Sequence, residues 1–282
     1  MTYKISKFIF LALAICTAFA SNATNMIPKE SRVPGGVAII NLKLPCTNNN
    51  AVLPTVYYLG HRTLVFPDAD NNWNTIIGIP LNAKVGVNTI EVTFKNKKTH
   101  RTFIVKQKKY PEERITLTNS RKANPLQEDL LVIEKQYLEI INTYATWSYG
   151  EIISAQLMLP VKGRKSSPFG FKRIMNNVAK DPHSGLDIAA PIGTEVKCPL
   201  SGKVINVGNF FYNGNTVFLD HGQGFITSYC HLNNIAVKKG QQLQEGDIIG
   251  EVGKTGRVTG PHLHWSVSLN NVRVDPQLFL NE

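Results

Sequence analysis

Glycine recurs between short apolar runs throughout the second half of this chain, and this pattern limits the folds available there. Gly193, Gly202 and Gly208 are the first of a series of glycines at the junctions. The runs themselves have the length and composition of strands: Glu195–Pro199, Lys203–Val207, Thr216–Asp220, Phe225–Leu232, Asp247–Val252 and Leu263–Leu269. Because glycine permits tight turns, such spacing predicts a compact, strongly curved antiparallel sheet. No stretch alternates strand and helix as a parallel α/β sheet would.

The first half of the chain predicts a second β-rich region, a small sandwich or barrel without catalytic residues. His61 and His100 have no potential metal ligand at suitable spacing, so we expect them at the surface or in turns. The basic stretch from Lys95 to Lys109 is interpreted as a solvated hairpin with a basic edge strand. The strands are expected at Val37–Leu44, Thr55–Leu59, Thr63–Phe66, Thr75–Ile79, Asn88–Phe94 and Arg101–Lys106.

Between these regions we expect a charged linker at 109–124 and then one amphipathic helix of about five turns. Asn124 would cap it, Pro125 fits its first position and Gln127 could complete a capping box. We expect its apolar stripe to pack on one of the domains, although a partner-binding helix is the alternative. That stripe recurs at helical spacing: Leu126, Leu130, Ile133, Tyr137, Ile140, Ile141 and Tyr144.

The predicted fold class is therefore mainly β, with two β-rich domains joined by an amphipathic helix. We expect a first β-rich domain at 24–108, a linker with the helix at 109–153 and a second β-rich domain at 154–282. Residues 1–23 have the features of a signal peptide. Lys4 and Lys7 precede a short apolar run, and small residues suited to cleavage stand at Ala20 and Ala23.

Cleavage there predicts a mature protein that is periplasmic or secreted and has no transmembrane span, because the apolar run is shorter than about 20 residues. Loss of the two lysines lowers the formal charge from +11 to +9. A basic exported protein suits an anionic cell wall or membrane surface, and its compartment argues against nucleic acid. Of the three remaining cysteines, Cys198 and Cys230 are expected to be buried thiols, with a disulfide between them as the alternative. Cys46 leaves the count odd.

Five residues in the second half could carry chemistry. His183 and Asp187 stand four apart around Gly185, which would let their side chains converge. His262 and His264 would project from one face of a strand, because side chains two apart share a face. His183, Asp187 and His264 would form a set that zinc accepts, with a fourth position left for water.

His231 and His262 remain as candidate acid–base residues, and His221 is given a structural role in a glycine-rich turn. The chain contains no His-Glu-x-x-His helix motif and no Gly-x-Ser-x-Gly elbow.

Residues 158 to 280 resemble the LytM/lysostaphin-like zinc endopeptidases, which cut the peptide part of bacterial peptidoglycan. The resemblance implies that His183, Asp187 and His264 bind zinc and that His231 and His262 are catalytic. It also implies D-alanyl–diaminopimelate cross-links as the target. It rests on five segments in the family's order: Ser167-Pro168-Phe169-Gly170, His183-Ser184-Gly185-Leu186-Asp187, Tyr229-Cys230-His231-Leu232, Gly253-Lys254-Thr255-Gly256 and Gly260-Pro261-His262-Leu263-His264-Trp265.

The first β-rich region is similar to the accessory region of exported Gram-negative relatives. We expect it to restrain or target the enzyme, with protein regulators as possible partners, so a chain beginning near Ser154 should keep zinc and activity. Phe169, Phe171 and Tyr212 either line a substrate groove or simply pack. The alternatives to an enzyme are a silent wall-binding protein or activator of another hydrolase, a biotin- or lipoyl-like carrier, and a structural wall-binding β-protein.

Overall fold

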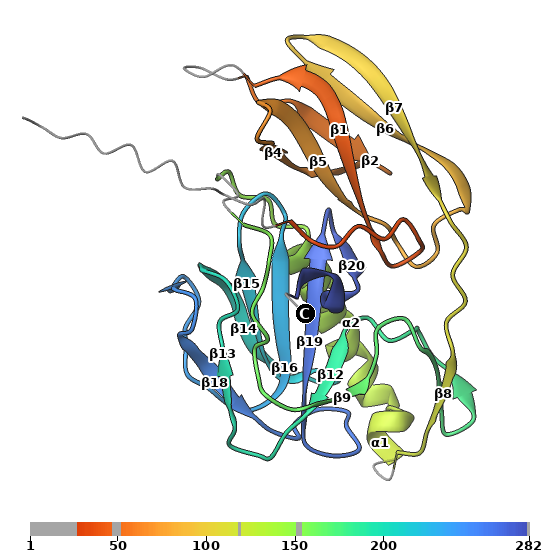
Figure 1. Cartoon of the computed structure of the whole chain (residues 1–282). Coiled ribbons are helices and arrows are strands. Elements are labelled where there is room, and N and C mark those ends of the chain that lie inside the picture. Colours follow the sequence, from red (N-terminus) through yellow and green to blue (C-terminus); the bar gives the residue numbers. More distant parts are fainter. Residues whose placement is uncertain (1–26, 47–51, 118–119, 151–153, 281–282) are drawn as a thin grey trace, which may run out of the picture.

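Strands dominate the computed structural model, which describes residues 27–46, 52–117, 120–150 and 154–280 (Figure 1). The expected signal peptide, with Lys4, Lys7, Ala20 and Ala23, lies outside the described residues. No helix in the described ranges is both long and apolar enough to cross a membrane. The predicted mainly β class, with two β-rich regions, is confirmed.

The first region consists of two small antiparallel sheets, with strand orders β1-β5-β4 and β3-β2-β6-β7. The six predicted strands are all present, and a two-residue strand, β3, was missed. The bounds are β1 (Val37–Pro45), β2 (Thr55–Tyr58), β3 (His61–Arg62), β4 (Leu64–Pro67), β5 (Asn72–Gly78), β6 (Gly86–Phe94) and β7 (Lys97–Val105).

Side chains from both sheets meet in one core, which makes this region the expected sandwich. Residues such as Ile77 of β5, Val92 of β6 and Phe103 of β7 are almost completely buried there. The basic strand β7 lies at a sheet edge, as predicted, where its lysines face solvent. His61 and His100 are exposed, and neither belongs to the group of possible metal ligands found in the described residues.

The second region is built on a ten-stranded antiparallel sheet whose main path runs β17-β14-β15-β16-β19-β12-β9. All six runs predicted here are strands, and six further strands were missed because they are short or polar. The bounds are β9 (Arg164–Ser167), β10 (Lys172–Met175), β11 (Val178–Ala179), β12 (Leu186–Ala189), β13 (Glu195–Lys197), β14 (Gly202–Phe210), β15 (Gly214–Asp220), β16 (Ile226–Ile235), β17 (Gln242–Leu243), β18 (Ile248–Val252), β19 (His262–Leu269), β20 (Val272–Val274) and the 3-10 helix η1 (Pro276–Phe279).

The expected linker at 109–124 contains regular structure, which corrects the sequence interpretation. Strand β8 (Glu112–Ile115) pairs in parallel with β10 of the second region, and helix α1 (Ser120–Ala123) follows. The long helix α2 (Gln127–Tyr144) begins two residues later than Asn124 would have allowed. Its first turn is closed by Asp129, whose carboxylate accepts a hydrogen bond from the Leu126 N–H at 3.0 Å.

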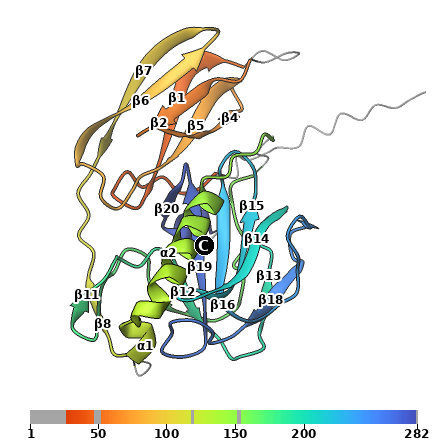
Figure 2. The ribbon, with the colours of Figure 1, turned by 180° about the vertical axis from the view of Figure 1, so that it is seen from behind.

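Helix α2 lies along the second region, in front of β16 and β19 in the view of Figure 2. The C-terminal end of α2 packs against the second region, where Tyr144 joins Phe210, Phe218 and Ile226 in a small apolar cluster. The Tyr144 hydroxyl is also 2.8 Å from Ser228 Oγ. The N-terminal half of the predicted stripe remains open to solvent: Leu126, Leu130 and Tyr137 are exposed.

The two β-rich regions share a core in addition to the segment that links them. Successive residues of β5 point to opposite faces, so Ile77 enters the sandwich core while Ile76 packs with residues of the second region. Leu64 and Phe66 of β4 join Ile76 in that second core, together with Leu269 of β19. The first region therefore packs directly against the sheet that contains the candidate site.

Candidate metal and active site

The pairing of β12 with β19 brings together residues far apart in the sequence. In this antiparallel register Asp187 is the direct partner of His264. His262 and His264 face the same side of β19, as predicted, whereas Leu263 and Trp265 are fully buried on the other side. A carboxylate and two imidazoles are thus held on neighbouring rigid strands.

Gly185 lets the loop before β12 approach β19 closely. A Cβ atom at this position would lie 2.5 Å from the Trp265 carbonyl oxygen and 2.8 Å from His264 Cε1, closer than real Cβ contacts allow. Only glycine fits without displacing the strand. The close approach places the His183 imidazole over the paired Asp187 and His264.

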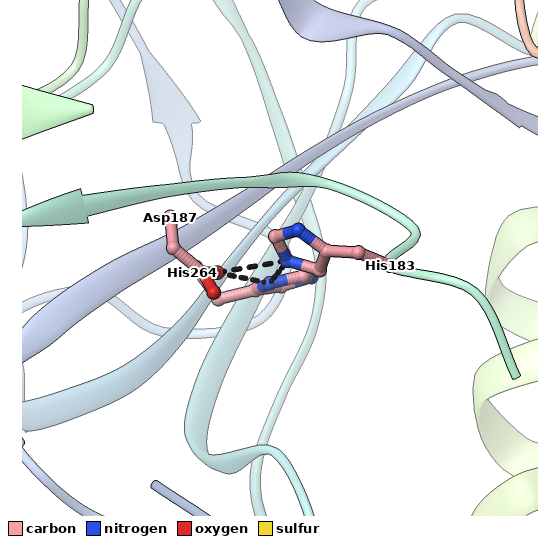
Figure 3. A group of neighbouring side chains, drawn as sticks. All are labelled: His183, Asp187 and His264. Atoms are coloured by element: carbon pink, nitrogen blue, oxygen red, sulfur yellow. Dashed lines mark hydrogen bonds and ion pairs between the residues drawn. The ribbon is translucent and has the colours of Figure 1, made fainter. Parts of the chain in front are cut away.

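Three ligand atoms meet at this point, and Figure 3 shows their side chains converging from two strands and the preceding loop. His183 Nε2 lies 2.9 Å from Asp187 Oδ1 and 2.9 Å from His264 Nδ1, and the latter two atoms are 2.7 Å apart. Neighbouring ligand atoms around tetrahedral zinc are separated by roughly 3.3 Å, given metal–ligand distances of about 2 Å. The three ligand atoms would therefore need to move apart only slightly to bind a zinc ion.

Hydrogen bonds at the outer edges of the rings fix which atoms face inward. His183 Nδ1 is 2.8 Å from the Pro168 carbonyl oxygen, which can only accept, so Nδ1 carries the proton. With a metal bound, the His183 ring would present its Nε2 lone pair, together with Asp187 Oδ1, to the shared cation. His264 has a similar outer partner, since its Nε2 lies 3.0 Å from Ser266 Oγ.

The electrostatics keep these groups in the protonation states that a metal requires. Burial alone would raise the pKa of Asp187, but hydrogen bonds with His183 and His264 hold it well below its usual range. Burial lowers the pKa of His264 to about 4, so its ring is neutral near pH 7. An ionised carboxylate and a neutral imidazole are the forms that bind zinc.

His231 and His262 form a second pair beside the three ligand atoms. Their ring centroids are 4.9 Å apart, and the centroid of His231 is 6.0 Å from that of His264. His262 Nε2 lies 3.8 Å from Asp187 Oδ1. The structure therefore brings all five sequence-predicted residues into one cluster, and it leaves the predicted structural histidine, His221, outside it.

The backbone at His231 departs from regular strand geometry. Its φ is 66°, a left-handed conformation that is unusual for a non-glycine residue. This interrupts the alternation of side chains after Cys230, which is the cross-strand partner of His264, and the His231 imidazole reaches the same cluster. Its Nδ1 lies 2.9 Å from the Thr255 carbonyl, which fixes the ring. Residues in strained backbone conformations are common at functional sites.

A cleft of about 440 Å³ opens onto this cluster. His183, His231 and His264 line its floor, and the exposed Tyr137 of α2 contributes to one wall. Among the three candidate groove aromatics, Tyr212 lines the cleft. Phe169 is instead buried and packs edge-on against Tyr110, with ring centroids 6.4 Å apart.

Sequence reasoning missed two residues that contact the proposed ligands, and one of them, Arg173, also lines the cleft. Arg173 Nη2 donates to Asp187 Oδ2 at 2.7 Å, and Ser167 Oγ lies 3.3 Å from His183 Nδ1. Neither residue stands at a spacing that reveals the contact. The remaining predictions are simpler: Cys198 and Cys230 are buried free thiols, and His221 has both ring nitrogens engaged by Ser201 and Thr227.

Both β-rich regions match models of known protein families. The model of peptidase family M23 matches residues 181–276, and that of the peptidase family M23 N-terminal domain matches residues 30–108. A crystal structure of a Pseudomonas aeruginosa protein assigned to peptidase M23 is 42% identical. It superposes with a TM-score of 0.74 over 89% of this chain and 95% of the other.

Two curated relatives match part of the chain. The peptidoglycan DD-endopeptidase ShyA of Vibrio cholerae is 47% identical over 109 residues, which cover 38% of this chain and 25% of ShyA. The DD-carboxypeptidase/endopeptidase Mpg of Neisseria meningitidis is 39% identical over 113 residues, 40% of this chain and 26% of Mpg. The match thus spans about a quarter of the length of these relatives.

Proposed function

The chain belongs to peptidase family M23, and from that premise we propose that it is a zinc-dependent endopeptidase that hydrolyses amide bonds in the peptide part of bacterial peptidoglycan. The observation that carries the proposal is the convergence of His183 Nε2, Asp187 Oδ1 and His264 Nδ1 within 2.9 Å of one another, beside two further histidines. The three atoms would hold the metal. The cleft leaves room for substrate.

When bound there, zinc supplies a Lewis acid and lowers the pKa of a water molecule to about 7. The chain's own histidines move protons beside it. His231 Nδ1 and His262 Nδ1 each lie 2.9 Å from a carbonyl oxygen, of Thr255 and Gly260 respectively, so both Nδ1 atoms are protonated. In a neutral ring of this tautomer, Nε2 can accept a proton from water and return it to the leaving amine. A protonated ring would also stabilise the oxyanion.

The donor set favours peptide over glycan as the target. Glycosidases usually place two carboxylates across the scissile bond, whereas Asp187 is the one carboxylate among the five clustered residues. By similarity to the DD-endopeptidase ShyA, we propose D-alanyl–diaminopimelate cross-links as the substrate. A periplasmic or secreted location follows from the N-terminal sequence, and the mature charge of +9 suits an anionic wall.

The mature protein should be tested on isolated peptidoglycan, with and without a chelator, and the products identified by mass spectrometry. We expect new free amino groups, loss of activity with chelator and recovery with zinc. Asp187→Asn should be inactive, because an amide is a poor zinc ligand. His100→Ala changes an exposed histidine far from the cleft and is the matched control.

Two outcomes would contradict the proposal. Reducing sugar ends without new amino groups would identify a glycosidase. Full activity of the Asp187→Asn variant in chelator would show that the cluster does not hold a catalytic metal.

A further inference from the structure

Strand β8 brings one acidic side chain from the segment between the two β-rich regions to the back of the candidate metal site. In the parallel pairing of β8 with β10, Glu113 lies beside Arg173. The neighbouring Glu112 instead pairs with Arg114, and both of these side chains are largely solvent-exposed. Only one of the two acidic residues of β8 therefore points toward the second region.

Glu113 contacts the two residues that hold the proposed zinc ligands in place. Its Oε2 accepts a hydrogen bond from Ser167 Oγ at 2.8 Å and lies 3.5 Å from Arg173 Nε. Ser167 Oγ is 3.3 Å from His183 Nδ1, and Arg173 Nη2 is 2.7 Å from Asp187 Oδ2. Each path from Glu113 to a proposed ligand therefore passes through a single side chain.

This network lies in a poorly solvated place, so its charges matter. The Arg173 side chain is only 16% exposed, and the Glu113 side chain is 25% exposed. The guanidinium is shared between two carboxylates, Glu113 and Asp187. Without the negative charge of Glu113, the Arg173 guanidinium would interact with the Asp187 carboxylate alone. An unbalanced positive charge would then lie close to the metal position.

We propose that Glu113 is a positioning residue for the metal site: it orients Ser167 and Arg173, and through them His183 and Asp187, for zinc binding. The segment from 109 to 123 then belongs to the catalytic unit instead of serving as a linker. This inference rests on the proposed function in one respect, that the cluster binds zinc. Partners that orient metal ligands from behind affect metal affinity by about 10- to 100-fold when they are removed.

The test compares Glu113→Gln with Glu112→Gln in the full mature chain. Glutamine keeps the shape of Glu113 and an oxygen for Ser167, but it removes the charge that faces Arg173. Zinc affinity is measured by competition with a chromophoric chelator, and the visible absorption of the cobalt-substituted protein reports on ligand geometry. The thermal midpoint of the metal-free protein reports on folding.

We expect Glu113→Gln to bind zinc about 10- to 100-fold more weakly and to shift the cobalt spectrum. Its metal-free thermal midpoint should match that of Glu112→Gln, which should keep the affinity of the unchanged protein. Equal zinc affinity in the two variants would overturn the inference. So would a lower midpoint with unchanged affinity, because that result assigns Glu113 a structural role.

If Glu113→Gln fails to fold, Glu113→Asp decides the matter. It keeps the charge but shortens the side chain by one methylene, so weakened zinc binding in a folded protein supports the inference and unchanged binding refutes it. These readouts do not require hydrolysis. A protein that binds zinc but leaves peptidoglycan intact would contradict the proposed function and leave the role of Glu113 standing.

Discussion

Asn270 and Gly78 join the two β-rich regions through a pair of hydrogen bonds. Asn270 Oδ1 accepts from the Gly78 N–H at 2.6 Å, and Asn270 Nδ2 donates to the Gly78 carbonyl at 3.1 Å. The Asn270 side chain thus acts as a strand partner for the end of β5. A second contact of this kind links Gln223 to both backbone groups of Val65. These buried bonds complement the shared apolar core.

Replacing Asn270 by alanine should lower the free energy of unfolding by about 1–3 kcal/mol relative to Asn271→Ala, because the Gly78 backbone groups lose buried partners. Asn270 and Asn271 both have positive φ, at 42° and 62°. The two variants therefore share the cost of alanine in a left-handed conformation, and their difference isolates the hydrogen bonds. Urea unfolding provides the measurement. Equal values would show that the contact adds no stability.

The strands of both regions could be predicted because their residues carry a local signal. Ile76 and Ile77 of β5, for example, belong to a β-branched run between turn residues, which is a local signal for a strand. This signal does not depend on which of the two hydrophobic cores each side chain joins. The candidate site was predictable for a different reason. His183, Asp187, His262 and His264 are chemically distinctive residues at spacings that strands and tight turns bring together.

What the sequence could not reveal depends on long-range pairing. Glu112–Ile115 is polar and short, and it becomes a strand only because β10 lies beside it. No local pattern distinguishes Glu113, which faces Arg173, from Glu112, which faces solvent. The start of α2 was also misplaced: Leu126 is its N-cap, and Asp129 in the first turn accepts a hydrogen bond from the Leu126 N–H.

Strand β8 changes the expected behaviour of a chain that begins near Ser154. Such a chain loses Glu113 and also Tyr144, which fills the cluster with Phe210 and Phe218. Compared with a chain beginning at Lys109, we expect weaker zinc binding and a lower thermal midpoint. Both shortened chains lack the first β-rich region, so the comparison isolates residues 109–153. Equal zinc affinity in the two would restore the sequence-based expectation.

Arg257 should contribute to substrate binding in the cleft. Its guanidinium stacks 4.2 Å from the centroid of the Tyr212 ring, and within the described part of the chain it forms no ion pair with a carboxylate. Stem peptides carry free carboxylates, which a planar guanidinium binds well. Arg257→Gln should raise KM by roughly tenfold with little change in kcat, because the contact exists before and during the reaction. Lys254→Gln, at an exposed neighbour, is the control, and a selective loss of kcat would contradict this role.

His264 and His262 stand two apart on β19 but should have different functions. His264 Nδ1 is 2.7 Å from Asp187 Oδ1 and faces His183, whereas His262 Nε2 is 3.8 Å from the same oxygen and its ring faces His231. His264→Ala should therefore lose bound zinc and some stability, because metal binding contributes to folding. His262→Ala should retain zinc and fold normally, while turnover falls by roughly a hundredfold or more.

Metal analysis and turnover of the two purified variants distinguish these roles, with His100→Ala as a control for the loss of an exposed imidazole. The contrast is informative because both residues share one strand face and both are only slightly exposed, at 12% for His264 and 14% for His262. A general effect on the strand would impair both variants alike. Zinc lost from His262→Ala but kept by His264→Ala would reverse the assignment. Near-normal turnover in both would remove these histidines from the reaction, since neither ligand loss nor loss of a proton-transfer group is compatible with full catalysis.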